Sequence, residues 1–116
     1  KKGTLRGLHY QIKPYQETKL ISCIQGEILD IVVDLRKESK TYLKYFCKIL
    51  SEKNKYSILV PRGFAHGYLT LKKNSIVLYL VDKNYNKKAE RILKHNDPHI
   101  GINWKQKPKF ISKKDR

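Results

Sequence analysis

Two histidines stand in segments whose composition is typical of a functional site. His9 lies in the segment 6–11, which reads RGLHYQ, and His66 lies in the segment 61–67, which reads PRGFAHG. The glycines beside them let backbone or ligand approach closely, which is common at binding and catalytic sites. Because a histidine titrates near neutral pH and is also a frequent metal ligand, the pair could transfer protons or hold a metal ion.

A metal site is the first of these possibilities. The segment 61–66 resembles the Pro-x-Gly-x-x-His motif that follows a His-x-His pair and an acidic residue in cupin barrels. Gln11 stands where the second histidine of that pair would be, and Glu17 is only a loosely spaced oxygen donor. Two histidines and an amide make a poor ligand set. The pattern therefore favours the barrel, and we expect no metal at this site.

Strands must position these segments, because apolar residues alternate or form short runs along the chain. We predict strands over residues 20–24, 28–35, 42–50, 56–60, 68–71 and 76–81, a tight turn or bulge at 25–27, and a loop at 61–67. After residue 84 the chain is more polar, with a helical turn expected over 86–91, a short strand at 100–102 and no clear period over 105–116. Short strands at this spacing predict a sandwich or barrel.

The length and net charge of the chain further restrict the class of protein to which it can belong. The chain has 116 residues, a one-domain length, and no apolar run long enough to span a membrane or serve as a secretory signal. Its formal net charge is +16, carried by 21 lysines but only 5 arginines. Arginine is the better reader of phosphate and guanine, and the lysines form no long block. We therefore expect a solvated lysine-rich surface, whose field would also attract a small anionic substrate.

Two cysteines, Cys23 and Cys47, lie in apolar strand-like runs. Two residues do not make a disulfide framework, so we expect buried thiols. Such thiols fit a reducing, cytoplasmic location.

Further motifs extend the pattern along the whole chain. The segment 6–11 is similar to an Arg-Gly-Leu-His-aromatic-Gln signature, and the segment 61–67 to a Pro-x-Gly-Phe-Ala-His-Gly loop. Other matches follow in the same order: Gly26-Glu27, Asp30, Val33–Arg36, Ser39, Leu78-Tyr79, Tyr85, Asn96–Pro98, Gly101–Trp104 and Ser112–Asp115. On these motifs the chain resembles the dTDP-4-dehydrorhamnose 3,5-epimerase (RmlC) family of the cupin superfamily.

The resemblance implies an all-β fold, a cupin-type double-stranded β-helix or jelly-roll barrel with short helical or irregular segments near the C-terminus. Residues 1–116 would form a single cupin-like epimerase domain. The family has a longer segment before the motif that begins at Arg6, which supplies strands, part of the dimer contact and some nucleotide ligands. We expect that segment to be absent here.

The resemblance also implies a cofactor-free isomerase that converts dTDP-4-dehydro-6-deoxyglucose to dTDP-4-dehydrorhamnose for polysaccharide biosynthesis. Protons on C3 and C5 of this sugar lie next to the C4 ketone, so their removal gives an enolate. His9 would be the base, Asp115 would orient its ring, Lys19 would stabilise the enolate oxygen, and Tyr79 would return a proton from the opposite face.

Other residues would contact the substrate by the same resemblance. Arg6 would bind the diphosphate and Tyr85 would stack on the base, while Trp104 is expected to be a packing residue. The full set expected to bind substrate is Arg6, Lys19, His66, Tyr85, Glu90 and Lys114. The expected partners are the nucleotide sugar and a second copy of the chain, without nucleic acid or membrane.

Three alternatives remain open from the sequence. The chain could be a single-centre epimerase that inverts only C3 or C5 of a related dTDP- or GDP-linked sugar, and no residue decides this. It could be a cupin that binds a sugar nucleotide without turnover. It could also be a basic nucleic-acid-binding module with steep salt dependence, although it lacks aromatics interleaved with arginine.

Overall fold

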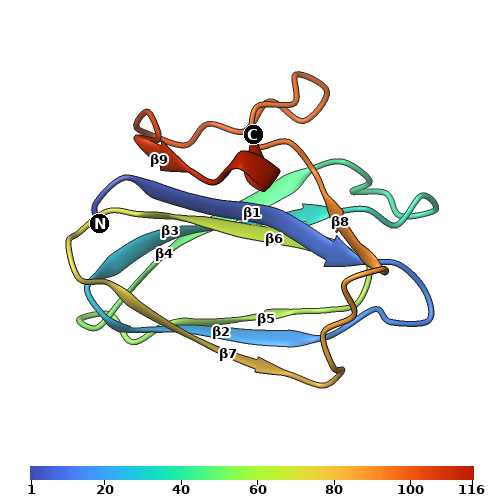
Figure 1. Cartoon of the computed structure of the whole chain (residues 1–116), viewed down its shortest axis with the longest axis horizontal. Helices are drawn as coiled ribbons and strands as arrows, with labels where there is room; N and C mark the ends of the chain where they lie inside the picture. The colour runs from blue at the N-terminus through green and yellow to red at the C-terminus, as the bar shows by residue number, and fades with distance from the viewer.

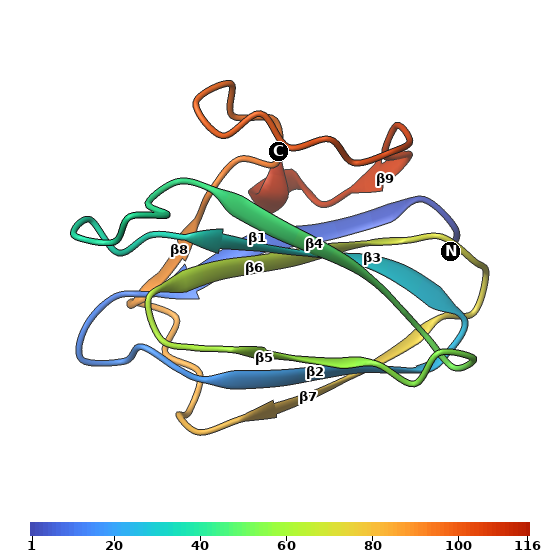
Figure 2. The same cartoon turned by 180° about the vertical axis from the view of Figure 1, so that it is seen from behind.

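The protein folds as two facing β-sheets. The computed structural model describes residues 1–116 throughout. Its elements are β1 (Thr4–Gln11), β2 (Lys19–Gln25), β3 (Glu27–Asp34), β4 (Tyr45–Ser51), β5 (Ser57–Val60), β6 (Phe64–Thr70), β7 (Ile76–Val81), β8 (Glu90–Ile92), β9 (Phe110–Ile111) and the 3₁₀-helix η1 (Lys113–Asp115). The larger sheet has the order β4-β3-β6-β1-β8 with β9 beside β1, and the smaller has the order β5-β2-β7 (Figures 1 and 2). This confirms the cupin-type barrel expected from the sequence.

Strand β3 is buried on both faces, which explains its almost continuous apolar sequence. Leu29, Ile31 and Val33 pack with Trp104 on one side. The C-terminal segment lies along this outer face of the larger sheet in Figures 1 and 2, and Trp104 is only 7 % exposed. Ile28 and other residues of opposite orientation face the smaller sheet in a second core cluster. Trp104 is thus a packing residue, as predicted.

The six predicted strands correspond to β2 through β7; the bounds of β7 match the prediction, and the other five differ at one or both ends. The predicted loop at 61–67 is wrong after residue 63, because Phe64 to Gly67 pair with β3. The turn at 25–27 is confirmed, since Gly26 has a φ of 81° between two strands. Strand β1 was not predicted, because its mixed polar and glycine-containing sequence has no clear alternation.

The C-terminal third was predicted less well. The helical turn predicted over 86–91 is only partly present. A hydrogen bond from the Glu90 amide to the Asn86 carbonyl closes one turn over residues 86–90, but β8 begins at Glu90. The predicted strand at 100–102 is absent, and the segment instead packs Ile100 and Ile102 irregularly against the core. Irregular backbone that is stabilised by such long-range packing has no local signal.

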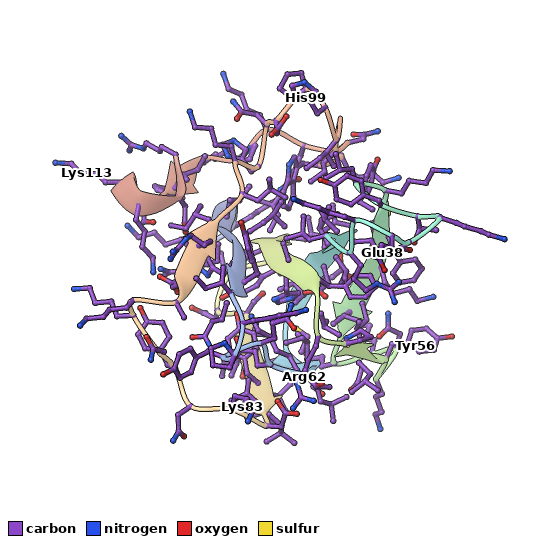
Figure 3. The ribbon with its side chains drawn as sticks, turned by 90° about the vertical axis from the view of Figure 1, so that its right-hand side faces the viewer. Glu38, Tyr56, Arg62, Lys83, His99 and Lys113 are labelled. Atoms are coloured by element: carbon purple, nitrogen blue, oxygen red, sulfur yellow. The ribbon has the colours of Figure 1, made fainter.

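Lysines project from the molecule on several sides. In Figure 3 the labelled side chains of Lys113, His99 and Tyr56 extend away from the barrel.

No helix of this structure is both long and apolar enough to span a membrane. Both cysteines are free thiols; Cys23 is buried as predicted, and Cys47 is only partly buried.

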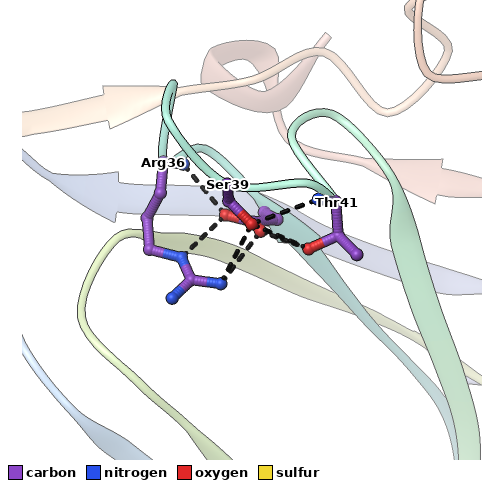
Figure 4. A network of polar contacts seen from close by, with 4 residues as sticks. Arg36, Ser39 and Thr41 are labelled. Atoms are coloured by element: carbon purple, nitrogen blue, oxygen red, sulfur yellow. Dashed lines mark hydrogen bonds and ion pairs between the residues drawn. The ribbon is translucent and has the colours of Figure 1, made fainter.

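A polar network holds the loop after β3. Asp34 accepts hydrogen bonds from Nε and Nη2 of Arg36, both at 3.0 Å, and from the hydroxyl of Thr41 (Figure 4). The bonds from Arg36, with help from Ser39 and Thr41, hold the pKa of this carboxyl well below its usual range despite its burial. The network fixes the segment 34–41 between β3 and β4.

The outer face of the smaller sheet is apolar and exposed. Leu59, Leu78 and Leu80 are 64, 45 and 57 % exposed. Leu59 and Leu80 both lie opposite Leu20 of the central strand β2. Directly opposite residues of antiparallel strands share a face. These side chains therefore form one patch, called here the leucine face.

Candidate active site

A cavity of about 520 Å³ opens between the two sheets. Arg6, His9 and His66 line it from the larger sheet, while Lys19 and Tyr79 line it from the smaller sheet. Its volume is in the range of small-molecule sites. The two sheets therefore supply opposite walls with different chemical groups.

Strand register brings the larger sheet's groups onto one face. Tyr68 lies opposite both Arg6 of β1 and Asp30 of β3, and His66 lies opposite His9 of β1. Because opposite residues point to the same side, these side chains form two adjacent rows facing the smaller sheet. The sequence did not identify Tyr68, although its spacing of two from His66 on a strand places both on one face.

A β-bulge explains the spacing of Arg6 and His9. Three residues apart on a regular strand, they would point to opposite faces. The register shifts between them, so three steps on β1 match two on β6. Gly7 at this bulge has a φ of 105°, and a Cβ there would lie 2.6 Å from the His66 carbonyl oxygen. Only glycine fits this position, which is the physical reason for its place in the RGLHYQ segment.

Asp115 reaches His9 from the far end of the chain. Its Oδ1 lies 2.7 Å from His9 Nε2, and its Oδ2 accepts a hydrogen bond from the Gly7 amide at 3.3 Å. Asp115 is 1 % exposed and the His9 side chain 25 % exposed. When His9 is neutral, donation to the carboxylate requires the proton on Nε2 and leaves Nδ1 as the basic nitrogen.

The hydrogen bonds to Asp115 outweigh the effect of burial on the pKa of its carboxyl group. Burial alone would raise the pKa of the carboxyl, but the hydrogen bonds from His9 and the Gly7 amide lower it below its usual value. Asp115 therefore stays ionised at neutral pH and can accept a hydrogen bond from His9. The predicted pairing of these two residues is present in the structure, while their catalytic roles remain predictions.

His66 belongs to a second, deeper pair. Its Nε2 lies 2.6 Å from Asp30 Oδ1, with the two side chains 3 % and 0 % exposed. Asp30 Oδ2 has no hydrogen-bond partner within the protein. The structure thus places His66 at the cavity wall, where it was predicted to contact substrate, but Asp30 occupies its Nε2. No role for Asp30 was predicted, because its partner lies 36 residues away.

Tyr79 faces the two histidines from the other sheet. It lies opposite the fully buried Ile21, so its ring points into the barrel. The ring centroid is 6.0 Å from that of His66 and 6.4 Å from that of Tyr68. The whole side chain is 44 % exposed because the cavity is open, yet burial of the hydroxyl, reinforced by Tyr68, raises the pKa of Tyr79. The phenol therefore keeps its proton at neutral pH.

Lys19 stands at the start of β2 with a carboxylate beside it. Its Nζ lies 3.4 Å from Glu17 Oε1, and the side chains are 14 and 13 % exposed. Both residues line the cavity. Lys19 is therefore held within the cavity and is not one of the surface lysines, and Glu17, considered above only as a metal ligand, is its charge partner.

Three predicted substrate contacts meet at the cavity mouth. Glu90 accepts hydrogen bonds from the Tyr85 hydroxyl and from Lys114 Nζ, both at 3.3 Å. Tyr85 and Lys114 are 62 and 54 % exposed, so both can reach a ligand outside the barrel. Arg6 lies further along the same cavity wall. The structure brings together all nine predicted site residues: seven line the cavity, while Asp115 and Lys114 contact the lining residues His9 and Glu90.

No group of three or more histidine, cysteine, aspartate or glutamate side chains is arranged to hold a metal ion. The Nε2 atoms of His9 and His66 each contact a different carboxylate. Two separate His–Asp pairs are better suited to proton transfer than to joint coordination.

Comparison with known proteins shows the family to which the chain is similar. The family model described as dTDP-4-dehydrorhamnose 3,5-epimerase matches residues 1–116. A curated relative of that name from Sinorhizobium fredii is 43% identical over 114 residues, which cover 97% of this chain and 58% of the relative.

Two solved structures are also very similar. The dTDP-4-dehydrorhamnose 3,5-epimerase of Bacillus anthracis, with TDP and PPi bound, superposes with a TM-score of 0.96 at 44% identity, covering 99% of this chain and 66% of that one. The dTDP-6-deoxy-D-glucose-3,5-epimerase of Legionella pneumophila, in complex with dTDP-4-keto-L-rhamnose, gives 0.93 at 36% identity, covering 98% and 61%. The present chain thus spans less than two thirds of each of these proteins.

Proposed function

The chain belongs to the dTDP-4-dehydrorhamnose 3,5-epimerase family, and from that premise we propose that it epimerises a nucleotide-diphospho 4-keto-6-deoxy sugar. The proposed reaction converts dTDP-4-dehydro-6-deoxyglucose to dTDP-4-dehydrorhamnose by inversion at C3 and C5. One observation carries the proposal: the His9–Asp115 pair and Tyr79 stand on opposite walls of one cavity. Inversion needs a base on one face of a carbon and an acid on the other.

The proposed steps follow from these groups. Nδ1 of His9 removes the proton from the carbon next to the ketone, and the electron pair moves onto the C4 oxygen as an enolate. Asp115 stabilises the imidazolium that forms. Lys19 stabilises the enolate oxygen by its charge. Tyr79 then donates its phenolic proton to the opposite face of the carbon, and exchange with solvent resets both residues before the second inversion.

The remaining predicted contacts are proposed for the nucleotide. Arg6 would bind the diphosphate, and Tyr85 would stack on the base at the mouth, where Glu90 and Lys114 meet it. His66, already bonded to Asp30, would contact the sugar. With these roles a large anionic ligand would extend from the cavity across the exposed rim that Tyr85 and Lys114 form.

We also propose that residues 1–116 act as one domain that forms a homodimer in the cytoplasm. The leucine face supports the dimer, because an exposed apolar patch over a three-stranded sheet with open edges is a typical association surface.

The decisive experiment follows deuterium at C3 and C5 by NMR while the chain acts on dTDP-4-dehydro-6-deoxyglucose in D₂O. We expect incorporation at both carbons, loss of incorporation in His9→Ala, and retention in the control His99→Ala. His99 also pairs with an aspartate, Asp97 at 3.0 Å, but on the surface. The control therefore removes an equivalent His–Asp pair outside the cavity.

Each other outcome has a defined meaning. Deuterium at a single carbon would replace the proposal with a single-centre epimerase. A folded chain that binds dTDP in calorimetry but exchanges neither carbon would be a non-catalytic binding protein. A folded chain that neither binds nor exchanges would overturn the proposal.

A further inference from the structure

The side-chain amide of Gln11 joins the two loops at the mouth of the cavity. Gln11 is the last residue of β1 and is 5 % exposed. Its Nε2 donates to the Tyr15 carbonyl at 2.7 Å and, at 3.5 Å, to the Asn84 carbonyl. Its Oε1 accepts from the Asn86 amide at 2.8 Å. One side chain therefore binds three backbone groups that lie up to 75 residues away in sequence.

These two loops carry groups proposed to contact the substrate. The loop after β1 leads through Glu17 to Lys19 at the start of β2, and the loop after β7 carries Tyr85. Tyr85 stands between Asn84 and Asn86, the two residues whose backbone Gln11 binds. The bonds on either side of Tyr85 therefore restrain the backbone from which its exposed ring projects.

We propose that Gln11 is a positioning residue that sets the nucleotide end of the site by holding Tyr85 in place. This inference rests on the proposed function. A primary amide suits the task because it has two hydrogens for two carbonyls and an oxygen for the backbone amide. A carboxylate of the same shape would point an acceptor at the carbonyls of Tyr15 and Asn84 and would leave both without a donor.

Lys19 provides a contrast that makes the proposal specific. It is held by pairing of β2 with both β5 and β7, and the neighbouring Thr18 amide donates to Asp82 at 2.8 Å. His9 and Tyr79 likewise stand within strands. Loss of the Gln11 amide should therefore weaken nucleotide binding much more than proton transfer.

The test uses two variants of nearly the same volume, Gln11→Glu and Gln11→Met. We expect the Kd for dTDP, measured by calorimetry, and the KM for the sugar nucleotide to rise roughly tenfold, while kcat changes less than about threefold. The control is Gln25→Met, which removes a comparable bond from Gln25 Nε2 to the Asn74 carbonyl at 2.6 Å. Gln25 lies at the other end of β2 from Lys19, so this variant should leave Kd and KM unchanged.

A double-mutant cycle with Tyr85→Ala separates positioning from a general loss of structure. If Gln11 acts through Tyr85, then Gln11→Glu should change the Kd for dTDP less than about twofold in the Tyr85→Ala background. A tenfold change in both backgrounds would overturn the proposal, as would unchanged Kd in both Gln11 variants. Failure of the wild-type chain to bind dTDP would instead overturn the proposed function.

Discussion

Asp115 Oδ1 lies 2.7 Å from His9 Nε2 although 106 residues separate them along the chain. The same carboxylate binds the Gly7 amide, which belongs to the bulge that turns His9 into the cavity. The orientation of the proposed base therefore depends on both ends of the chain.

Replacing Asp115 with asparagine should slow the reaction while preserving most of the shape. The uncharged side chain would no longer stabilise an imidazolium on His9, so we expect kcat to fall by roughly 10²- to 10⁴-fold. The rate of deuterium incorporation measures this effect directly. Asp97→Asn, which alters the surface pair with His99, is the matched control and should leave kcat unchanged.

Gly7→Ala should destabilise the fold because both the backbone conformation and the space exclude a Cβ. The φ of 105° is unfavourable for alanine, and the added atom would lie 2.6 Å from the His66 carbonyl oxygen. We expect a loss of about 2 to 4 kcal/mol in the free energy of unfolding, measured with denaturant.

Gly101→Ala separates the effect of a positive φ from that of the steric clash of the added Cβ. Gly101 also has a positive φ, 66°, but nothing lies within 4 Å of an added Cβ. This control should cost only about 1 kcal/mol. Equal effects of the two substitutions would show that the close approach of β1 to β6 has no energetic consequence.

Low pH should reduce the free energy of unfolding, partly because Asp34 becomes protonated. Its pKa is held below the usual range in the folded state, so its contribution to stability is present above the unfolded pKa of about 3.9 and is lost as pH falls below it. Asp34→Asn should lower the free energy of unfolding by about 2 kcal/mol at pH 7 and make its decline below pH of about 4 shallower.

Glu38→Gln is the control for this pH dependence. Glu38 is exposed on the same loop, and none of the ion pairs of the structure includes it. Its substitution should leave the pH profile of unfolding as in the wild type. An Asp34→Asn profile parallel to that of the wild type would contradict the role assigned to the network in Figure 4.

The proposed dimer can be tested on the leucine face. Leu80→Lys introduces a charge where the side chain is 57 % exposed, so it should disrupt association without unfolding the chain. Sedimentation should then show a monomer, whereas the wild type should sediment as a dimer. Tyr42→Lys alters an apolar side chain that is 39 % exposed on the β3–β4 loop and should leave the dimer intact. Dimers of unchanged affinity in Leu80→Lys would place the interface elsewhere.

Sequence patterns predicted the β-fold well where apolar residues alternate or run together, as in β2, β3 and β7. They failed at β1, because Arg6 and His9 share a face only through a bulge at Gly7, and bulges break the period of two. They also missed the strand within the predicted helical turn at 86–91, where long-range pairing with β1 decides the conformation.

The predicted site residues followed from family motifs rather than from local chemistry. The structure adds the groups that act on them: Asp30 behind His66, Glu17 beside Lys19, and Gln11 between the loops. The contacts of Asp30 with His66 and of Gln11 with Asn86 join residues 36 and 75 positions apart, whereas Glu17 is close to Lys19 in the sequence. A single sequence holds no signal for such pairs, because spacing along the chain does not report distance across a barrel.

The central claim is that His9 and Tyr79 act on opposite faces of the sugar carbon, and Tyr79→Phe tests it most directly. With His9 intact, this variant should still exchange deuterium into C3 and C5 of dTDP-4-dehydro-6-deoxyglucose in D₂O, but the deuterated sugar should keep its original configuration. Tyr56→Phe, which changes an exposed tyrosine outside the cavity, should invert both carbons as the wild type does. Inverted product formed by Tyr79→Phe at the wild-type rate would contradict the account.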